Sequence, residues 1–196
     1  GNYHLGGAPF NFAAHAVQCG LNSAIISALG TDGLGNKAKA EIHQLKVNDA
    51  FVQQSEKETG TFKVTLHNGQ PEYNITKEVA YDYILTHKID FELLNQYDSF
   101  YFGTLAQRNP VSQACLKMIF ERCSFEMVFL DVNLRQSFYS MTTIEFSIEH
   151  CTILKLNDEE VATISEMLFS ESYDLEDFAN QLLKRFVNLE TIIITR

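Results

Sequence analysis

No segment of the 196-residue sequence is suited to spanning a membrane, because it contains no run of about 18 apolar residues. The first residues also lack a basic segment followed by an apolar one, which is the pattern of an export signal. From these two absences we expect a cytoplasmic protein that does not act at a membrane.

Positive charge is scarce as well. Lysine and arginine number 15 against 25 aspartates and glutamates, so the net charge is −10 at pH 7. The basic residues are scattered along the chain, and most of such a surface repels a phosphate backbone. Nucleic acid is therefore not an expected partner.

Cysteine and histidine show no metal-binding pattern. The four cysteines, Cys19, Cys115, Cys123 and Cys151, form no CxxC pair, and the six histidines include no HExxH motif. Because the neighbours of the cysteines are apolar, we expect reduced thiols in the core rather than disulfides. No cage for a structural or catalytic metal is predicted.

What the sequence does contain is typical of one globular domain. Hydrophobic residues make up 45% and charged residues 20% of a chain without internal repeats or low-complexity linkers. We therefore expect a single α/β domain over residues 1–196, with a small inserted β lid at about 51–76.

Strand and helix patterns alternate along the chain. Strands are predicted at 23–29, 51–54, 99–103, 125–132, 152–156 and 191–195, and helices at 9–19, 36–45, 110–122, 142–149, 158–167 and 173–186. This order predicts parallel βαβ units in a doubly wound sheet, with helices on its faces. Ligands of such sheets bind beyond the carboxyl ends of the strands, here just after Leu29, Phe102, Leu130 and Lys155.

The inserted segment has the pattern of a β-hairpin. Residues 61–67 alternate apolar and polar side chains, Asn68-Gly69 is a strong hairpin-turn signal, and Pro71 favours an edge position for the returning strand. A hairpin with one apolar face between α/β units can act as a lid or as a dimer contact, so a homodimer through this lid is a further expectation.

A pair of glycines near the start offers a binding turn. Gly6 and Gly7 allow a ligand to approach the backbone, and Pro9 suits the first turn of a helix. Asn11 then presents an amide with donors and an acceptor. The turn predicts a cradle for a small polyhydroxylated molecule, the alternative being a glycine turn that only begins a buried helix.

This Gly-Gly-Ala-Pro-x-Asn sequence resembles the first signature of the ribokinase-like (PfkB) sugar kinases, and its Ala-Pro form is most like the fructokinase branch. Further segments resemble the same family in the same order, at residues 30–35, 102–105, 131–135 and 155–160. The resemblance implies a three-layer α/β/α fold and an enzyme that uses ATP and Mg²⁺. The implied reaction transfers the γ-phosphoryl group to a sugar hydroxyl, with fructose converted to fructose 6-phosphate.

The resemblance also implies roles for individual residues. Gly6, Gly7 and Asn11 match the sugar-contacting positions, and Arg135 would lie near the sugar or the transferred phosphoryl group. The Asn-x-x-Glu motif formed by Asn157 and Glu160 would support the nucleotide phosphates, with Glu160 reaching Mg²⁺ through water.

Some of these residues also have a purely structural interpretation. Arg135 could instead pair with Asp131, and the acids at 158–160 could serve only to stabilise a helix N-terminus. The Gly30–Gly35 turn lacks the Gly-x-Gly-x-x-Gly order, and Asp32 would face a pyrophosphate, so a turn near the sugar is expected rather than the nucleotide site of an oxidoreductase.

One part of the family pattern does not occur in these residues. The general base of the family is an aspartate in a Gly-Ala-Gly-Asp sequence, which residues 1–196 do not contain. We expect this base beyond Arg196 and a further sugar-binding aspartate before Gly1, so no catalytic residue is assigned here. The alternative is a sugar-binding or regulatory protein that has lost the base.

Overall fold

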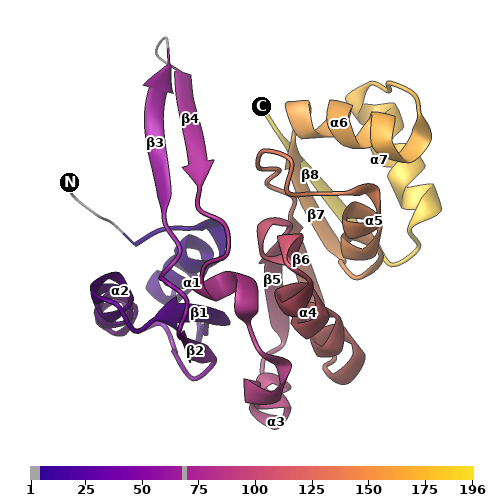
Figure 1. The fold of residues 1–196 in the computed structure, drawn as a ribbon. Helices are drawn as coiled ribbons and strands as arrows, with labels where there is room; N and C mark the ends of the chain where they lie inside the picture. The colour runs from indigo at the N-terminus through magenta and orange to yellow at the C-terminus, as the bar shows by residue number, and fades with distance from the viewer. Residues whose placement is uncertain (1–4, 68–69) are drawn as a thin grey trace. The chain divides into compact units, whose positions relative to one another are not determined.

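The computed structural model describes residues 5–67 and 70–196, and it leaves aside the side chains of residues 63–67 and 70–73. The backbone forms two compact units. One consists of Gly1–Ile89 with Asn109–Cys115, and the other of Asp90–Arg108 with Leu116–Arg196. Figure 1 labels the helices and strands of both.

The first unit combines a small parallel sheet, two helices and a hairpin. Strands β1 (Ser27–Gly30) and β2 (Val52–Ser55) pair in parallel, and they are accompanied by α1 (Ala8–Gln18) and α2 (Gly33–Gln44). Strands β3 (Phe62–His67) and β4 (Gln70–Ile75) form the antiparallel hairpin, which is followed by the 3-10 helices η1 (Ala80–Tyr83) and η2 (Thr86–Lys88).

The core of this unit lies between the helices and the small sheet. Helix α1 buries Phe10, Ala13 and Ala14, which share one helical face because they are spaced by three and four residues. They pack with Ile42 of α2 and with Ile25 ahead of β1. The face of α1 that carries Asn11 is exposed, so the sequence buries one side of this helix and leaves the other open.

Apart from shifts of one residue at the ends of helices and strands, the observed elements of this unit differ from the predicted ones at three places. Helix α2 begins at Gly33 rather than 36 because the Asp32 side chain caps it. The predicted strand 23–29 is regular only in β1, and Ala24 makes a single bridge to Asn48. Residues 52–55, grouped with the lid in the sequence, pair with β1. The predicted turn Asn68-Gly69 lies outside the described residues.

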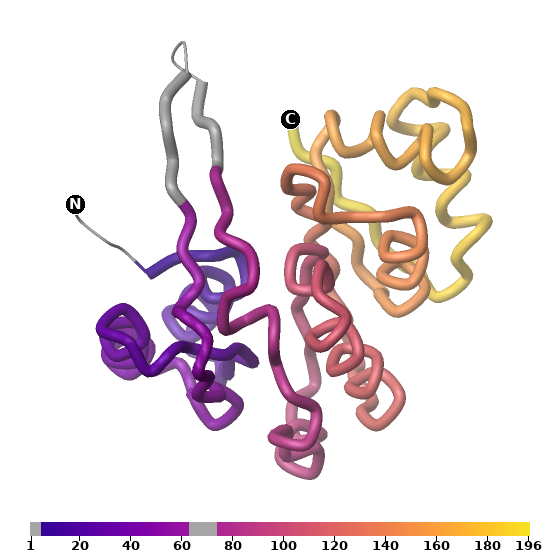
Figure 2. The backbone as a smooth tube through the Cα atoms, in the orientation of Figure 1, coloured from indigo at the N-terminus to yellow at the C-terminus, as the bar shows by residue number. Residues whose placement is uncertain are grey.

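The second unit is a four-stranded parallel sheet in the order β5-β6-β7-β8. Its strands are β5 (Ser99–Gly103), β6 (Met127–Asp131), β7 (Ile153–Asn157) and β8 (Thr191–Thr195). The chain reaches successive strands through helices, as Figure 2 shows. These helices are α3 (Phe91–Leu94), η3 (Leu105–Arg108), α4 (Pro110–Arg122), α5 (Met141–Glu149), α6 (Asp158–Phe169) and α7 (Leu175–Arg185), and residues 110–115 of α4 belong to the first unit.

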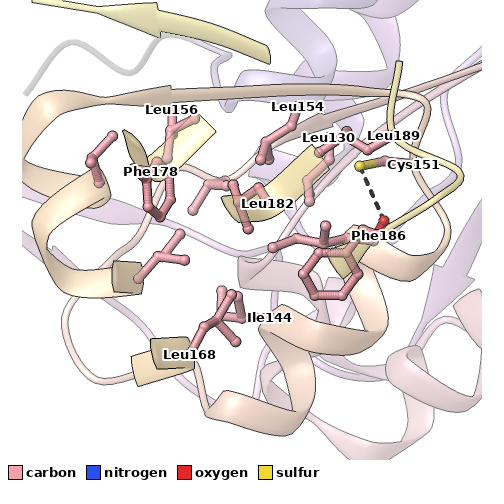
Figure 3. Packing of buried hydrophobic residues seen from close by; sticks show 14 of the residues in the cluster. Leu130, Ile144, Cys151, Leu154, Leu156, Leu168, Phe178, Leu182, Phe186 and Leu189 are labelled. Atoms are coloured by element: carbon pink, nitrogen blue, oxygen red, sulfur yellow. Dashed lines mark hydrogen bonds between the residues drawn. The ribbon is translucent and has the colours of Figure 1, made fainter. Parts of the chain in front are cut away.

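The core of the second unit forms where one face of the sheet meets these helices. Leu130 and Leu154 of the sheet are fully buried with Ile144 of α5 and with Phe178 and Leu182 of α7 (Figure 3). Strand residues two apart share a face, so alternate residues of β6 and β7 enter this core. The parallel α/β architecture predicted from the sequence is confirmed.

The thiols only partly follow the prediction. All four cysteines are free, and burial raises the pKa of Cys115 and raises that of Cys151 to about 12. Cys19, however, is exposed because it stands at the C-terminal cap of α1, so its assignment to the core is wrong. Among the helices at residues 5–67 and 70–196, none is long and apolar enough to cross a membrane.

Candidate functional site

The glycine turn before α1 is open to solvent. Gly7 has φ 106°, a conformation that glycine adopts easily, and it stands at the N-cap of α1, where its carbonyl accepts the backbone N–H of Asn11 at 3.0 Å. Gly7 and Asn11 are both exposed, while Gly6 is half-buried. Backbone and side-chain polar groups of this turn are therefore accessible to a small polar ligand.

The base of the hairpin lies beside this turn. A methyl group added to Gly6 would lie 3.7 Å from Cε1 of Phe62, the first residue of β3, and Phe62 is 49% exposed. The hydroxyls of Thr61 and Thr76 lie 3.2 Å apart where the hairpin begins. The glycine turn thus has an aromatic ring beside Gly6.

The segment 81–83, a few residues after the hairpin, is engaged within the first unit. The Asp82 side chain is 1% exposed and accepts the backbone N–H of Val79 at 3.2 Å. Tyr83 donates a hydrogen bond to Glu78. Asp82 is therefore a structural group of the η1 turn.

The Gly30–Gly35 turn is held by Asp32. Its carboxylate accepts the backbone N–H of Gly35 at 2.7 Å and the backbone N–H of Thr59 at 2.7 Å. These hydrogen bonds, that from Thr59 first and then that from Gly35, lower the pKa of Asp32. A Cβ at Gly35 would overlap the carbonyl of Gly30, so the turn needs glycine for close packing.

At the end of β6 in the second unit, Asp131 has a cationic partner other than Arg135. Its carboxylate accepts the Tyr101 hydroxyl at 2.8 Å and pairs with Lys155 Nζ at 3.0 Å. Burial first, and then this bond to Asp131, raise the pKa of Tyr101. The sequence analysis assigns no role to the side chains of Tyr101 and Lys155, although a lysine inside the apolar strand at 153–157 is a visible signal.

The loop after β6 brings Arg135 close to the Asn-x-x-Glu motif. Glu160 is 5% exposed, and its carboxylate accepts the backbone N–H of Leu134 at 2.7 Å and that of Asn157 at 2.9 Å. Asn157 in turn caps α6 by accepting the N–H of Glu160 at 2.8 Å. The six predicted site residues therefore form two groups, with Gly6, Gly7 and Asn11 in the first unit and Arg135, Asn157 and Glu160 in the second.

The second group has features that suit a phosphate and a hydrated cation. The capping bond uses Oδ1 of Asn157 and leaves its Nδ2 donors for a phosphate oxygen, at the positive end of the α6 dipole. Both oxygens of Glu160 already accept an N–H, so each keeps only its second lone pair. That arrangement fits contact with Mg²⁺ through water better than a direct bond.

Comparison with known proteins gives one family. The sequence model of the pfkB family of carbohydrate kinases matches residues 1–196. An uncharacterized sugar kinase of Pyrococcus horikoshii is 28% identical over 166 residues, which are 81% of this chain and 54% of that protein. The chain thus spans about half the length of this relative.

Solved structures resemble the fold. The same Pyrococcus kinase in complex with ATP has a TM-score of 0.78 at 25% identity, over 83% of this chain and 57% of that one. A fructokinase of Vibrio cholerae with fructose, ADP and a calcium ion has a TM-score of 0.81 at 19% identity, over 97% and 62%. The ribokinase-like α/β fold class predicted from the sequence is confirmed.

Proposed function

The chain belongs to the PfkB family of carbohydrate kinases, and from this premise we propose that the protein carrying it transfers the γ-phosphoryl group of ATP to a sugar hydroxyl. The sugar we propose is fructose, with fructose 6-phosphate as product, because Ala8-Pro9 follows the glycine pair in the form typical of the fructokinase branch. The main support for the proposal is the turn formed by Gly6, Gly7 and Asn11, in which Gly7 and Asn11 are exposed.

Both substrates, the sugar and ATP, have candidate binding residues. The sugar approaches the glycine backbone, and the Asn11 amide donates to and accepts from its hydroxyls. The Asn157 amide and the Arg135 guanidinium bind phosphate oxygens, for which a planar cation is well suited. Mg²⁺, when bound, neutralises phosphate charge, and Glu160 holds its water shell.

The proton of the attacking hydroxyl needs an acceptor. We expect it to be the aspartate of a Gly-Ala-Gly-Asp sequence, which residues 1–196 do not contain. The proposed activity therefore belongs to the protein that includes this chain, in the cytoplasm.

The hairpin β3–β4 is proposed as a lid that excludes water, since hydrolysis of ATP competes with transfer to the sugar. We also propose that it contributes to a homodimer. Sedimentation of the full-length protein should then give a dimer mass, and deletion of 62–75 should give a monomer; a monomer before deletion would contradict the dimer.

The reaction is tested by sugar-dependent ADP release from the full-length protein. We expect stimulation by fructose, in a panel with ribose, adenosine and 2-keto-3-deoxygluconate. Sugar binding in calorimetry without any ADP release would favour a non-catalytic sugar-binding protein. Absence of both binding and release would refute the proposal.

A further inference from the structure

The carboxylate of Glu160 joins the loop that follows β6 to the end of the neighbouring strand β7. Oε1 accepts the N–H of Leu134, after β6, and Oε2 accepts the N–H of Asn157, at the end of β7. The two acceptor distances, 2.7 and 2.9 Å, are those of charge-assisted hydrogen bonds. Because the side chain is 5% exposed, water competes little for these bonds.

The loop that Glu160 holds does not have a relaxed backbone. Asn133 has φ 46° and Gln136 has φ 49°, and both lie in the left-handed region that residues with a Cβ seldom adopt. Leu134 lies outside every helix and strand, so its N–H has no ladder partner to fix it. The bond to Glu160 thus anchors this peptide.

Arg135 depends on the same peptide. Its Nη1 donates to the carbonyl of Leu134 at 3.1 Å. Leu134 therefore receives the guanidinium on its carbonyl side and is held by Glu160 on its N–H side.

We propose that Glu160 is the positioning residue for Arg135, acting through the backbone of Leu134. This role adds to the water-mediated contact with Mg²⁺, since the second lone pairs of the carboxylate are not used by the two N–H groups. The kinetic part of the proposal rests on the proposed kinase function, whereas its structural part does not.

The structural part is tested by amide hydrogen exchange on the full-length protein without nucleotide or metal. The Leu134 amide is expected to exchange at least about tenfold more slowly than an unprotected loop amide. If the Leu134 amide of the unmodified protein exchanges as fast as an unprotected loop amide, the proposal is wrong.

Glu160→Gln sharpens this test. A glutamine still serves in a capping box, so its single oxygen stays with Asn157 while its amide meets the N–H of Leu134. Exchange at Leu134 should then rise at least about tenfold, because that N–H loses its acceptor. Glu159→Gln removes the same charge from an exposed neighbour at the same helix end and should leave exchange at Leu134 unchanged. Equal exchange in both variants would contradict the proposal.

The kinetic part is tested by a double-mutant cycle. Glu160→Gln should lower kcat about tenfold or more in the unmodified protein and by a clearly smaller factor in Arg135→Ala, because the part of its effect that acts through Arg135 is already lost there while the contact with Mg²⁺ remains to be lost. Losses that multiply would mean that Glu160 acts independently of Arg135, which contradicts the proposal. If the unmodified protein shows no sugar-dependent ADP release, the kinase function fails and the exchange experiment alone decides the positioning role.

Discussion

Asp32 is bound to Thr59, 27 residues further along the chain, by two hydrogen bonds: Oδ2 accepts the Thr59 backbone N–H at 2.7 Å and Oδ1 accepts its hydroxyl at 2.8 Å. The Thr59 hydroxyl also accepts the backbone N–H of Gly30 at 3.0 Å. Asp32 thus ties the end of β1 and the start of α2 to the chain that leads into the hairpin. The aspartate of this glycine-rich turn therefore has a structural role at the base of the hairpin.

Asp32→Asn should lower the free energy of unfolding by about 1–3 kcal/mol, because one side of the amide would direct a donor at the donor of Thr59. Urea denaturation measures the change. Thr59→Ser keeps the hydroxyl and the backbone N–H and serves as the control, with a smaller loss expected. An Asp32→Asn variant as stable as the unmodified protein would contradict the assigned role.

The contribution of Asp32 should also depend on pH in a defined direction. Its pKa lies below the usual 3.8 in the folded state, so its stabilisation is complete above the unfolded pKa and is lost as the pH falls through the folded pKa. The stability difference between the unmodified protein and Asp32→Asn should therefore be constant above about pH 5 and shrink below about pH 4. A difference that stays constant to about pH 2 would show that the charge is not responsible.

Gly6→Ala and Gly7→Ala should separate binding from folding. The added methyl at Gly6 makes an ordinary contact with Phe62, and Gly6 has no left-handed φ, so the melting temperature should change little. At Gly7, φ 106° strains any side chain, and stability should fall by about 1–3 kcal/mol. Gly6→Ala should still raise the sugar KM about tenfold, because its methyl occupies the cradle. An unchanged KM would remove Gly6 from the site.

Asn11→Ala should weaken sugar binding in a folded protein. Asn11 is exposed on α1, and alanine is the better helix former, so thermal unfolding should show no loss of stability. The sugar KM should rise about tenfold or more, as expected when a ligand hydroxyl loses its partner, while the KM for ATP stays within about twofold. Equal effects on both KM values would mean that Asn11 does not select the sugar.

Regular elements could be predicted from the sequence where local signals agree. Residues 99–103, 110–122 and 191–195 were predicted with the bounds observed, because an apolar strand pattern or a proline at a helix start defines them locally. The short elements η1, η2 and α3 were not predicted. They are too short for a periodic pattern. The residue after η1 is also held from a distant part of the chain, since the backbone N–H of Ile84 donates to the hydroxyl of Ser112.

In the candidate site, too, some residues could be predicted from the sequence, whereas the contacts between distant residues could not. The sequence motifs identify Gly6, Asn11 and Glu160, because each lies in a short pattern with a chemical reason. The bond from Leu134 to Glu160 joins residues 26 positions apart, and that from Tyr101 to Asp131 joins residues 30 apart. Such pairs follow from the register of parallel strands, which no local pattern specifies.

Transfer of the phosphoryl group to the sugar can be followed with γ-labelled ATP and fructose given to the full-length protein. We expect the label in fructose 6-phosphate, and a rate at low fructose that falls about tenfold in Gly6→Ala. Label found only in ATP and inorganic phosphate, with fructose and with every other sugar of the panel, would contradict the proposed function.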